Sequence, residues 1–340
     1  MHSLLVTGAA GFIGSNFVRL LVSRREKVKI VAFDKLTYCG NLANLKGLLS
    51  ENTIFVRGDI CDAEAVKAAC DQHKITQIIN FAAESHVDRS ILGSGPFVQA
   101  NVVGTQVLLD LAKARGIDRF LQVGTDEVYG TLPEDHPEIK FTEQTPLQPN
   151  SPYSASKAAA DCIVRAYFHT FGMPVLISRC SNNYGPFQFP EKLIPLFVTN
   201  LMEGKKVPLY GDGLNVRDWL HVEDHCEALW TVLAKGKPGE VYNIGGNNEI
   251  NNRKITETIL HEMGKDWDAS VQYVKDRPGH DRRYAIDAGK IKNELGWEPK
   301  HRFAEAIKST IQWFKDNEAW WRAIKSGEYL KYYDEQYGDR

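Results

Sequence analysis

Several features that would place a chain in a specialised class are missing from this sequence. No apolar run approaches the roughly 20 residues of a membrane-spanning helix, and no charged leader precedes an apolar stretch at the start. The formal net charge is only −2, with lysine and arginine spread along the chain. We therefore expect no secretory signal, no membrane and no nucleic acid partner, although a nucleotide-sized anion would need only a few local positive charges.

The spacing of the cysteines and histidines gives no positive indication of a disulfide framework or a metal site. The six cysteines show no C-x-x-C pair and no disulfide-framework spacing, so we expect reduced thiols in a cytoplasmic protein. The ten histidines show no H-E-x-x-H motif. We predict no metal.

What the sequence does contain is a regular alternation of strand-like and helix-like segments. The chain has 340 residues, 43% hydrophobic, which is enough for a full core. Short β-branched runs alternate with helical patterns through the first half, and this alternation predicts an α/β fold with a doubly wound parallel sheet of the Rossmann type. The expected strands are Ser3–Thr7, Lys29–Phe33, Thr53–Val56, Gln77–Phe81, Arg119–Val123 and Val175–Ser178. The expected helices run to about Val22 and over Ala63–His73, Val98–Arg115 and Pro152–Phe171.

The pattern changes after Asn182, where prolines and glycines interrupt it. His221–Ala234 and Val241–Ile244 resemble one further helix and strand returning to the sheet. We therefore predict a dinucleotide-binding domain over 1–183, with 218–246 returning to it, and a smaller, interleaved C-terminal substrate-binding domain over 184–217 and 247–340. Ligands of open parallel sheets bind beyond the carboxyl ends of the strands.

A glycine turn follows the first predicted strand. Gly8, Gly11 and Gly14 give the spacing G-x-x-G-x-x-G, one residue wider than G-x-G-x-x-G. A tight turn at a helix N-terminus lets the backbone approach a pyrophosphate, although glycines in a turn are often only a turn.

An acidic residue in the right place strengthens this interpretation. Asp34 ends the second predicted strand, about 20 residues after Gly14, where a carboxylate accepts hydrogen bonds from ribose hydroxyls and repels a 2′-phosphate. The combination predicts NAD rather than NADP. Asp59 and Ile60, after the next strand, are placed to hold the adenine, although an aspartate there is more often a cap.

Tyr153 and Lys157 lie four residues apart at the start of a predicted helix and so share one face. A phenol has a pKa of about 10, and a nearby ammonium and a cationic nicotinamide would both favour its phenolate. Such a pair alone is often a packing tyrosine and a solvated lysine.

The surroundings of this pair are more specific. Thr125, Asp126 and Glu127 follow a predicted buried strand, at the sheet edge that the Tyr153 helix also faces. Adjacent carboxylates on a surface are usually a solvated turn, but here they resemble an acid and a base. Each raises the pKa of the other, which helps to keep one protonated.

Together these motifs resemble the extended short-chain dehydrogenase/reductase family, and within it the nucleotide-sugar 4,6-dehydratases that act on dTDP-hexoses. The resemblance covers nearly the whole chain, and its most specific segments are Phe81–Ser90, Cys180–Pro186, Pro190–Pro195, Arg217–Leu220 and Asp276–Tyr284.

The resemblance implies a mechanism. Tyr153, assisted by Lys157, would deprotonate the sugar 4-hydroxyl during oxidation at C4, while Thr125 orients the oxygen. Glu127 would then remove the C5 proton and Asp126 would protonate the departing 6-hydroxyl. Hydride return to C6 regenerates NAD, so the reaction is that of a lyase.

The resemblance also implies ligand contacts and a homodimer built on the two long helices. For the cofactor these are Gly8, Gly11, Phe12, Ile13, Gly14, Asp34, Lys35, Leu36, Thr37, Asp59, Ile60, Phe81, Ala82, Ala83, Ser85, Tyr153, Lys157 and Asn183. For the nucleotide sugar they are Ser85, Thr125, Asn182, Lys192, Leu193, Pro208, Leu209, Tyr210, Arg217, Asn252, Asp276 and His280.

Two positions depart from the family pattern, and several alternatives stay open. Gly124 stands where relatives commonly carry serine, and Ala100 where a cofactor-contacting threonine is common. The choice of thymine over uracil rests on resemblance alone, so a UDP-glucose dehydratase is an alternative. A 4-epimerase would leave Asp126 and Glu127 idle, a decarboxylase fits them less well, and a dinucleotide sensor would not need Tyr153 and Lys157.

Overall fold

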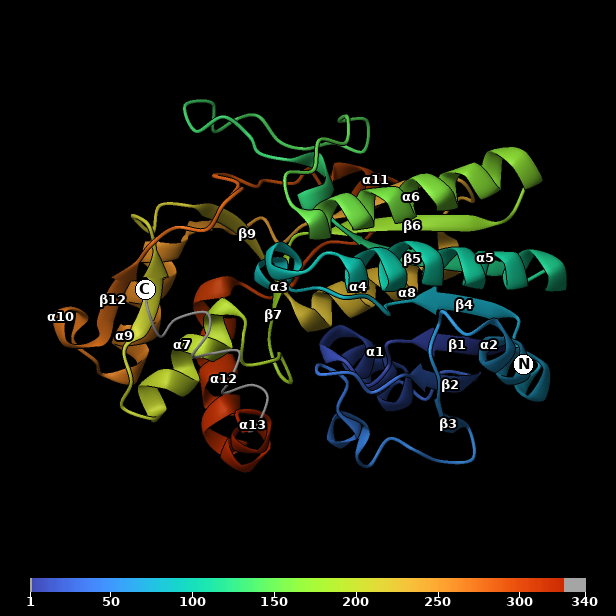
Figure 1. Ribbon diagram of the computed structural model, residues 1–340, viewed down its shortest axis with the longest axis horizontal. Coiled ribbons are helices and arrows are strands. Elements are labelled where there is room, and N and C mark those ends of the chain that lie inside the picture. Colours follow the sequence, from blue (N-terminus) through green and yellow to red (C-terminus); the bar gives the residue numbers. More distant parts are fainter. Residues whose placement is uncertain (1, 327–340) are drawn as a thin grey trace.

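The core of the protein is a seven-stranded parallel sheet in the computed structural model, which describes residues 2–326 (Figure 1). The strand order is β10-β6-β5-β4-β1-β2-β3, which is doubly wound with β1 near the centre. The strands are β1 (His2–Thr7), β2 (Val28–Asp34), β3 (Thr53–Arg57), β4 (Gln77–Asn80), β5 (Arg119–Thr125), β6 (Val175–Cys180) and β10 (Val241–Ile244). The predicted fold class is confirmed.

Helices cover both faces of this sheet, which explains why its strands are apolar on both sides. On one face lie α1 (Phe12–Ser23), α8 (Val222–Lys235) and α11 (Gly289–Leu295). On the other lie α2 (Ala63–His73), α5 (Gly104–Arg115) and α6 (Pro152–Phe171). Two separate hydrophobic clusters therefore pack against the two faces of the sheet.

The start of α6 is fixed by its own sequence. Ser151 and Ser154 form a reciprocal capping box, and Pro152 occupies the first helical position, where its missing N–H costs nothing. Gly172, in the left-handed conformation at φ 66°, ends the helix. These signals place Tyr153 in the first turn, against the carboxyl end of the sheet.

The helix predicted over 98–115 is interrupted. The segment begins as α4 (Gly95–Phe97), continues through a π-helical turn, η2 (Val98–Val103), and becomes α-helical only at α5. Asn101 within this turn exchanges two hydrogen bonds with the backbone of Glu84 and donates a third to Ser156. A π-helical turn commonly marks a functional site, and this one lies beside the ligand cavity.

The remaining elements form a C-terminal lobe beside the carboxyl ends of the main strands (Figure 1). It contains a three-stranded sheet, β7 (Asn182–Tyr184), β9 (Val216–His221) and β11 (Glu249–Asn251), and a two-stranded one, β8 (Val207–Tyr210) with β12 (Val271–Val274). Its helices are α7 (Leu193–Met202), α9 (Asn252–Met263), α10 (Trp267–Ser270), α12 (Phe303–Asp316) and α13 (Glu318–Ile324). None of the helices within residues 2–326 is both long and apolar enough to cross a membrane.

The two lobes interleave along the chain, but not at every predicted point. Helix α8 and strand β10 do return to the main sheet. Residues 218–221, expected there as well, instead belong to β9 of the small sheet. Helix α11, which the sequence assigns to the C-terminal domain, packs through Ile291 against the core of the main sheet. The domain boundaries stay a prediction, and 327–340 lie outside the described residues.

Candidate active site

A cavity of about 570 Å³ runs along the carboxyl ends of the main strands toward the C-terminal lobe. This volume is typical of small-molecule and cofactor sites. All five predicted catalytic residues line it, together with every predicted cofactor residue except Leu36. Both carboxylates of the Asp126–Glu127 pair therefore share one cavity with Tyr153, as the proposed elimination chemistry requires.

The glycine turn forms the floor of this cavity between β1 and α1. Gly8 has φ +64°, a conformation that L-residues with side chains rarely adopt. A Cβ on Gly14 would collide with the carbonyl oxygen of Gly8, so the helix approaches the turn more closely than any side chain permits. The first-turn N–H groups of α1 consequently face a surface that an anionic pyrophosphate can reach.

We expect Gly14→Ala to abolish dinucleotide binding and to destabilise the fold by about 1–3 kcal/mol, the usual cost of overpacking. Gly93→Ala is the matched control, because a Cβ there meets nothing within 4 Å. Thermal unfolding and calorimetric titration with NAD measure both effects. Equal NAD affinity in the two variants would contradict the role given to the turn.

Asp34 is held in place by two backbone hydrogen bonds. Its Oδ2 accepts a hydrogen bond from Ala10 N at 2.9 Å and its Oδ1 accepts one from Leu36 N at 2.8 Å. Burial raises the pKa of this carboxyl, and the two backbone bonds oppose that rise. Leu36, at φ 60°, contributes its backbone to Asp34 and its side chain does not line the cavity. At the adenine end, Lys35 pairs with Asp59 at 2.7 Å.

The Tyr153–Lys157 pair projects from α6 into the cavity, with 8% and 5% of each residue exposed. Lys157 Nζ donates to the carbonyl oxygen of Val123 at 2.7 Å, which leaves two of its three hydrogens for a ligand. Burial and the charge of Glu127 raise the pKa of Tyr153 well above its ordinary value, while a hydrogen bond with Thr125 lowers it.

The sequence-based expectation that Lys157 would draw the pKa of Tyr153 downward is therefore not met in the protein alone. The physical reason is that burial of Tyr153, together with the negative charge of Glu127, opposes formation of a phenolate. A positive charge arriving with the cofactor would act in the opposite sense.

The two carboxylates differ in their surroundings. Strand β5 ends at Thr125, whose hydroxyl caps the short helix η3 (Asp126–Tyr129) by accepting from Glu127 N at 3.3 Å. Asp126 is 1% exposed, and its Oδ2 is buried without a hydrogen-bond partner. Burial and the charges of Glu127 and Asp218 raise its pKa well above the ordinary value. Asp126 is therefore suited to hold a proton.

Glu127 lies in a less adverse environment for a charge. Burial raises its pKa and the net shift is upward, but the nearby charges of Arg277, Lys192 and Arg217 oppose that rise. The pKa of Asp126 is raised further, so Glu127 is the more readily ionised of the two carboxyls. This difference is compatible with the predicted roles of Asp126 as an acid and Glu127 as a base.

The predicted substrate residues divide into two groups. Ser85, Thr125, Asn182 and Lys192 line the cavity, and Lys192 Nζ donates to the carbonyl oxygen of Ser85 at 2.8 Å. The others do not line it; they are Leu193, Pro208, Leu209, Tyr210, Arg217, Asn252, Asp276 and His280. Leu209 is packed in the core of the C-terminal lobe, so its side chain serves packing.

Arg217 is not the solvated surface residue of one sequence-based interpretation, and its role as a diphosphate partner stays a prediction. It is buried, and its guanidinium donates to the carbonyl oxygens of Val216 and Asp281, each at 2.7 Å. The group also lies over the ring of Tyr284, 4.1 Å from its centroid. Two of its donors are therefore already engaged within the protein.

Sequence reasoning missed several cavity residues. Cys180 stands at the carboxyl end of β6, and the strand-end rule that selected Thr125 could have selected it too. Cys39, Gln188 and Phe189 reach the cavity from irregular loops, where no sequence pattern predicts direction.

Within the described part of the chain, His221, Glu223 and His301 come close enough to share a metal ion. The two imidazole rings stack at 4.2 Å with 29° between their planes, so their in-plane lone pairs do not converge on one point. A hydrogen bond from His301 to Asp224 at 2.9 Å raises the pKa of His301, and a protonated histidine is not a ligand. The geometry favours an ion pair, and the absence of a metal stays a prediction.

The parallel sheet, the glycine turn and the Tyr153–Lys157 pair define a short-chain dehydrogenase/reductase of the extended type. Residues 5–310 match the family model described as GDP-mannose 4,6 dehydratase. The dTDP-glucose 4,6-dehydratase of Xanthomonas campestris is 52% identical over 97% of each chain. The chain therefore belongs to the family of dTDP-glucose 4,6-dehydratases.

Solved structures agree with this placement. The crystal structure of the dTDP-glucose 4,6-dehydratase from Streptomyces venezuelae, with NAD and the nucleotide ligand TYD bound, is 50% identical, with a TM-score of 0.91 over 95% of this chain and all of that one. A UDP-glucose 4-epimerase from Thermus thermophilus in complex with NAD is similar at 30% identity, with a TM-score of 0.85 over 93% of this chain and 99% of that one.

Proposed function

We propose that this chain, using NAD, converts dTDP-glucose into the dTDP-4-keto-6-deoxy sugar with loss of water. The observation that carries the proposal is the pair of buried carboxylates, Asp126 and Glu127, in the same cavity as Tyr153 and with distinct electrostatic surroundings. Oxidation and reduction at C4 alone require no second acid and base. Elimination of water requires both.

The side chains of the cavity supply each proton transfer. Tyr153 accepts the proton of the sugar 4-hydroxyl, Thr125 hydrogen-bonds the same oxygen, and Lys157 stabilises the phenolate. A nicotinamide dinucleotide bound in the cavity would supply the hydride acceptor for C4 and the hydride donor for C6. The 4-ketone acidifies the C5 hydrogen, which Glu127 removes, and Asp126 donates its proton to the departing 6-hydroxyl. A proton returned to C5 completes the reaction, which consumes no NAD overall.

The residues of the cavity fit a dinucleotide. Gly8, Gly11 and Gly14 would bear the pyrophosphate, Asp34 the ribose, and Lys157 the nicotinamide ribose through its two remaining hydrogens. The relatives with NAD bound support this assignment. A homodimer is proposed on the same grounds of family resemblance, and a cytoplasmic location on the absence of disulfide-framework spacing among the cysteines.

The strongest alternative is a 4-epimerase, because a relative with that activity shares the fold. Asp126 argues against it, because burying a carboxyl with an unpartnered oxygen is costly and an epimerase has no use for the resulting acid. A UDP-sugar dehydratase would use the same groups and differ only in base recognition.

Mass spectrometry of the sugar products separates these possibilities. With dTDP-glucose and NAD, we expect a product about 18 mass units lighter than the substrate, because one water is eliminated, and no net formation of NADH. A product of unchanged mass that co-elutes with dTDP-galactose would show an epimerase. Parallel incubation with UDP-glucose tests the base, and binding without turnover of either sugar would refute the proposal.

A further inference from the structure

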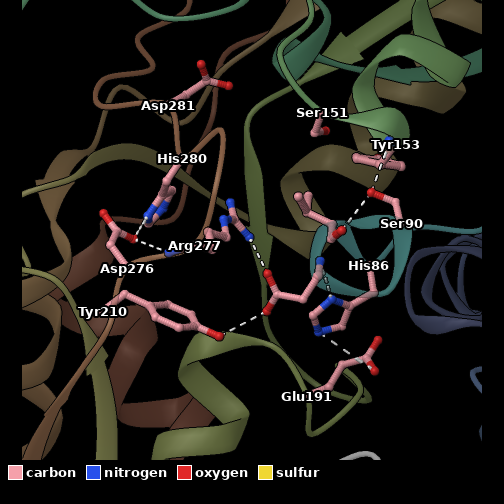
Figure 2. Close-up of polar contacts among 12 residues, drawn as sticks. His86, Ser90, Ser151, Tyr153, Glu191, Tyr210, Asp276, Arg277, His280 and Asp281 are labelled. Atoms are coloured by element: carbon pink, nitrogen blue, oxygen red, sulfur yellow. Dashed lines mark hydrogen bonds and ion pairs between the residues drawn. The ribbon is translucent and has the colours of Figure 1, made fainter. Parts of the chain in front are cut away.

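A short helix, α3 (Val87–Leu92), lies between the catalytic residues and the C-terminal lobe. The side chain of its residue Asp88 makes hydrogen bonds to that lobe. Figure 2 shows the setting, with His86 and Ser90 on the α3 side and Tyr210, Arg277 and His280 opposite. None of the proton transfers described above uses this helix. Its contacts nevertheless lead directly to the active site.

Helix α3 is anchored to the catalytic helix. The hydroxyl of Ser90 accepts a hydrogen bond from Tyr153 N at 3.2 Å and donates one to the carbonyl oxygen of Val87 at 2.6 Å. At the other end, His86 Nδ1 accepts from Asp88 N at 3.2 Å, and burial lowers the pKa of His86 well below its ordinary value. The neutral ring thus holds the first turn, and its Nε2 lies 3.8 Å from Glu191.

From this anchored helix, Asp88 reaches across to the C-terminal lobe. Its Oδ1 accepts from Arg277 Nη1 at 3.2 Å, and its Oδ2 accepts from the hydroxyl of Tyr210 at 3.1 Å. Asp88 is 5% exposed. A carboxylate this deeply buried needs such partners, because its desolvation is otherwise uncompensated.

The arginine that Asp88 holds faces the proposed base. Burial lowers the pKa of Arg277, but the charges of Asp88 and Glu127 outweigh it, and the net shift is upward. In turn, Arg277 is the strongest of the charges that lower the pKa of Glu127. Its guanidinium therefore pairs with Asp88 at 3.2 Å and acts electrostatically on Glu127 in the cavity, and its Nε is buried without a partner.

We propose that Asp88 is a positioning residue that holds Arg277 and Tyr210 beside the active-site cavity, so that the C-terminal lobe meets the substrate in a fixed geometry. Asp88 does not touch the reacting atoms. Ser90 and His86 fix where its carboxylate stands, and the carboxylate fixes the guanidinium. The kinetic consequences rest on the proposed function, whereas the effect on the 276–280 segment does not.

Asp88→Asn tests the proposal in the full-length, NAD-loaded protein, because it keeps the shape and a hydrogen-bond partner for Tyr210 but removes the charge. We expect the KM for dTDP-glucose and the Kd for dTDP each to rise about tenfold, with kcat within about twofold, because residues that act on a ligand site without touching the ligand change its affinity by about 2- to 30-fold. Asp71→Asn is the matched control, since it removes an exposed carboxylate paired with Arg115.

A double-mutant cycle with Arg277→Gln distinguishes positioning from a general structural role. If Asp88 acts through Arg277, adding Asp88→Asn to Arg277→Gln changes the KM and Kd by less than about twofold. Effects that multiply, or tighter dTDP binding by Asp88→Asn, would overturn the proposal. Tighter binding would mean that the carboxylate competes with the diphosphate.

Hydrogen exchange gives a readout that needs no sugar. In Asp88→Asn, amides of the 276–280 segment should exchange faster than in the wild type. Unchanged exchange would refute the proposal that Asp88 holds Arg277 in place. Failure of the wild type to dehydrate dTDP-glucose would contradict the proposed function, but it would not affect the hydrogen-exchange result for the 276–280 segment. Should Asp88→Asn fail to fold, Tyr210→Phe keeps the charge pair and should show faster exchange and a smaller rise in KM; no change in either would count against the proposal.

Discussion

Glu127→Gln should leave the enzyme able to oxidise the sugar but unable to expel water, so that enzyme-bound NADH accumulates. The amide keeps the shape of the side chain and cannot accept the C5 proton. Loss of a general base costs about 10²–10⁴-fold in rate. Mixing the variant with dTDP-glucose should produce absorbance at the NADH band that persists, while release of the dehydrated product falls by that factor.

The electrostatics of the cavity sharpen this expectation. The charge of Glu127 raises the pKa of both Tyr153 and Asp126, so removing it should make the phenolate easier to form. The first oxidation should therefore be as fast as in the wild type or faster. Glu138→Gln, the same change at an exposed residue, is the control. Normal product release by Glu127→Gln would show that another group takes the C5 proton.

The parts of the fold that the sequence predicts well are those whose signals are local. Helix α2 spans Ala63–His73 as expected, because Asp62 caps its first turn through its side chain. Helix α6 spans Pro152–Phe171 as expected, because the Ser151 capping box and Gly172 define its two ends. The five residues predicted to be catalytic also carry local signals, a strand end or an i, i+4 spacing in a helix, and all five line the cavity.

The parts that escaped prediction depend on contacts between distant segments. The π-helical turn over Val98–Val103 accompanies the bonds of Asn101 to Glu84 and Ser156, which no helical pattern contains. Arg217 looked like a free cation, but backbone carbonyls from the 281–282 segment occupy its guanidinium. The partnership of Asp88 with Arg277 joins residues 189 positions apart.

The electrostatic expectations fared unevenly for a related reason. Adjacency along the chain correctly suggested that the charge of Glu127 raises the pKa of Asp126. It did not reveal that burial is the larger cause, nor that burial of Tyr153 opposes the phenolate. Desolvation depends on what packs around a group in three dimensions, and sequence spacing does not report it.

Tyr153→Phe should abolish the first step and with it all later chemistry. Without the phenol, the proton of the 4-hydroxyl has no acceptor, because Glu127 and Asp126 serve the later steps, so hydride transfer stops. We expect kcat to fall about 10³-fold or more, the upper range for loss of an acid–base group, and no NADH to form on mixing with dTDP-glucose.

This outcome separates Tyr153 from Glu127 by spectroscopy alone, because both variants lose product but only Glu127→Gln should hold NADH. Tyr167→Phe is a close control: it lies on the same helix, and its hydroxyl bonds to Asp110 away from the cavity. The ring of Tyr153 packs near Phe97, and phenylalanine preserves that contact, so NAD and dTDP should still bind. Rapid NADH formation by Tyr153→Phe would mean that a different base starts the reaction, and the order of proton transfers would have to be assigned anew.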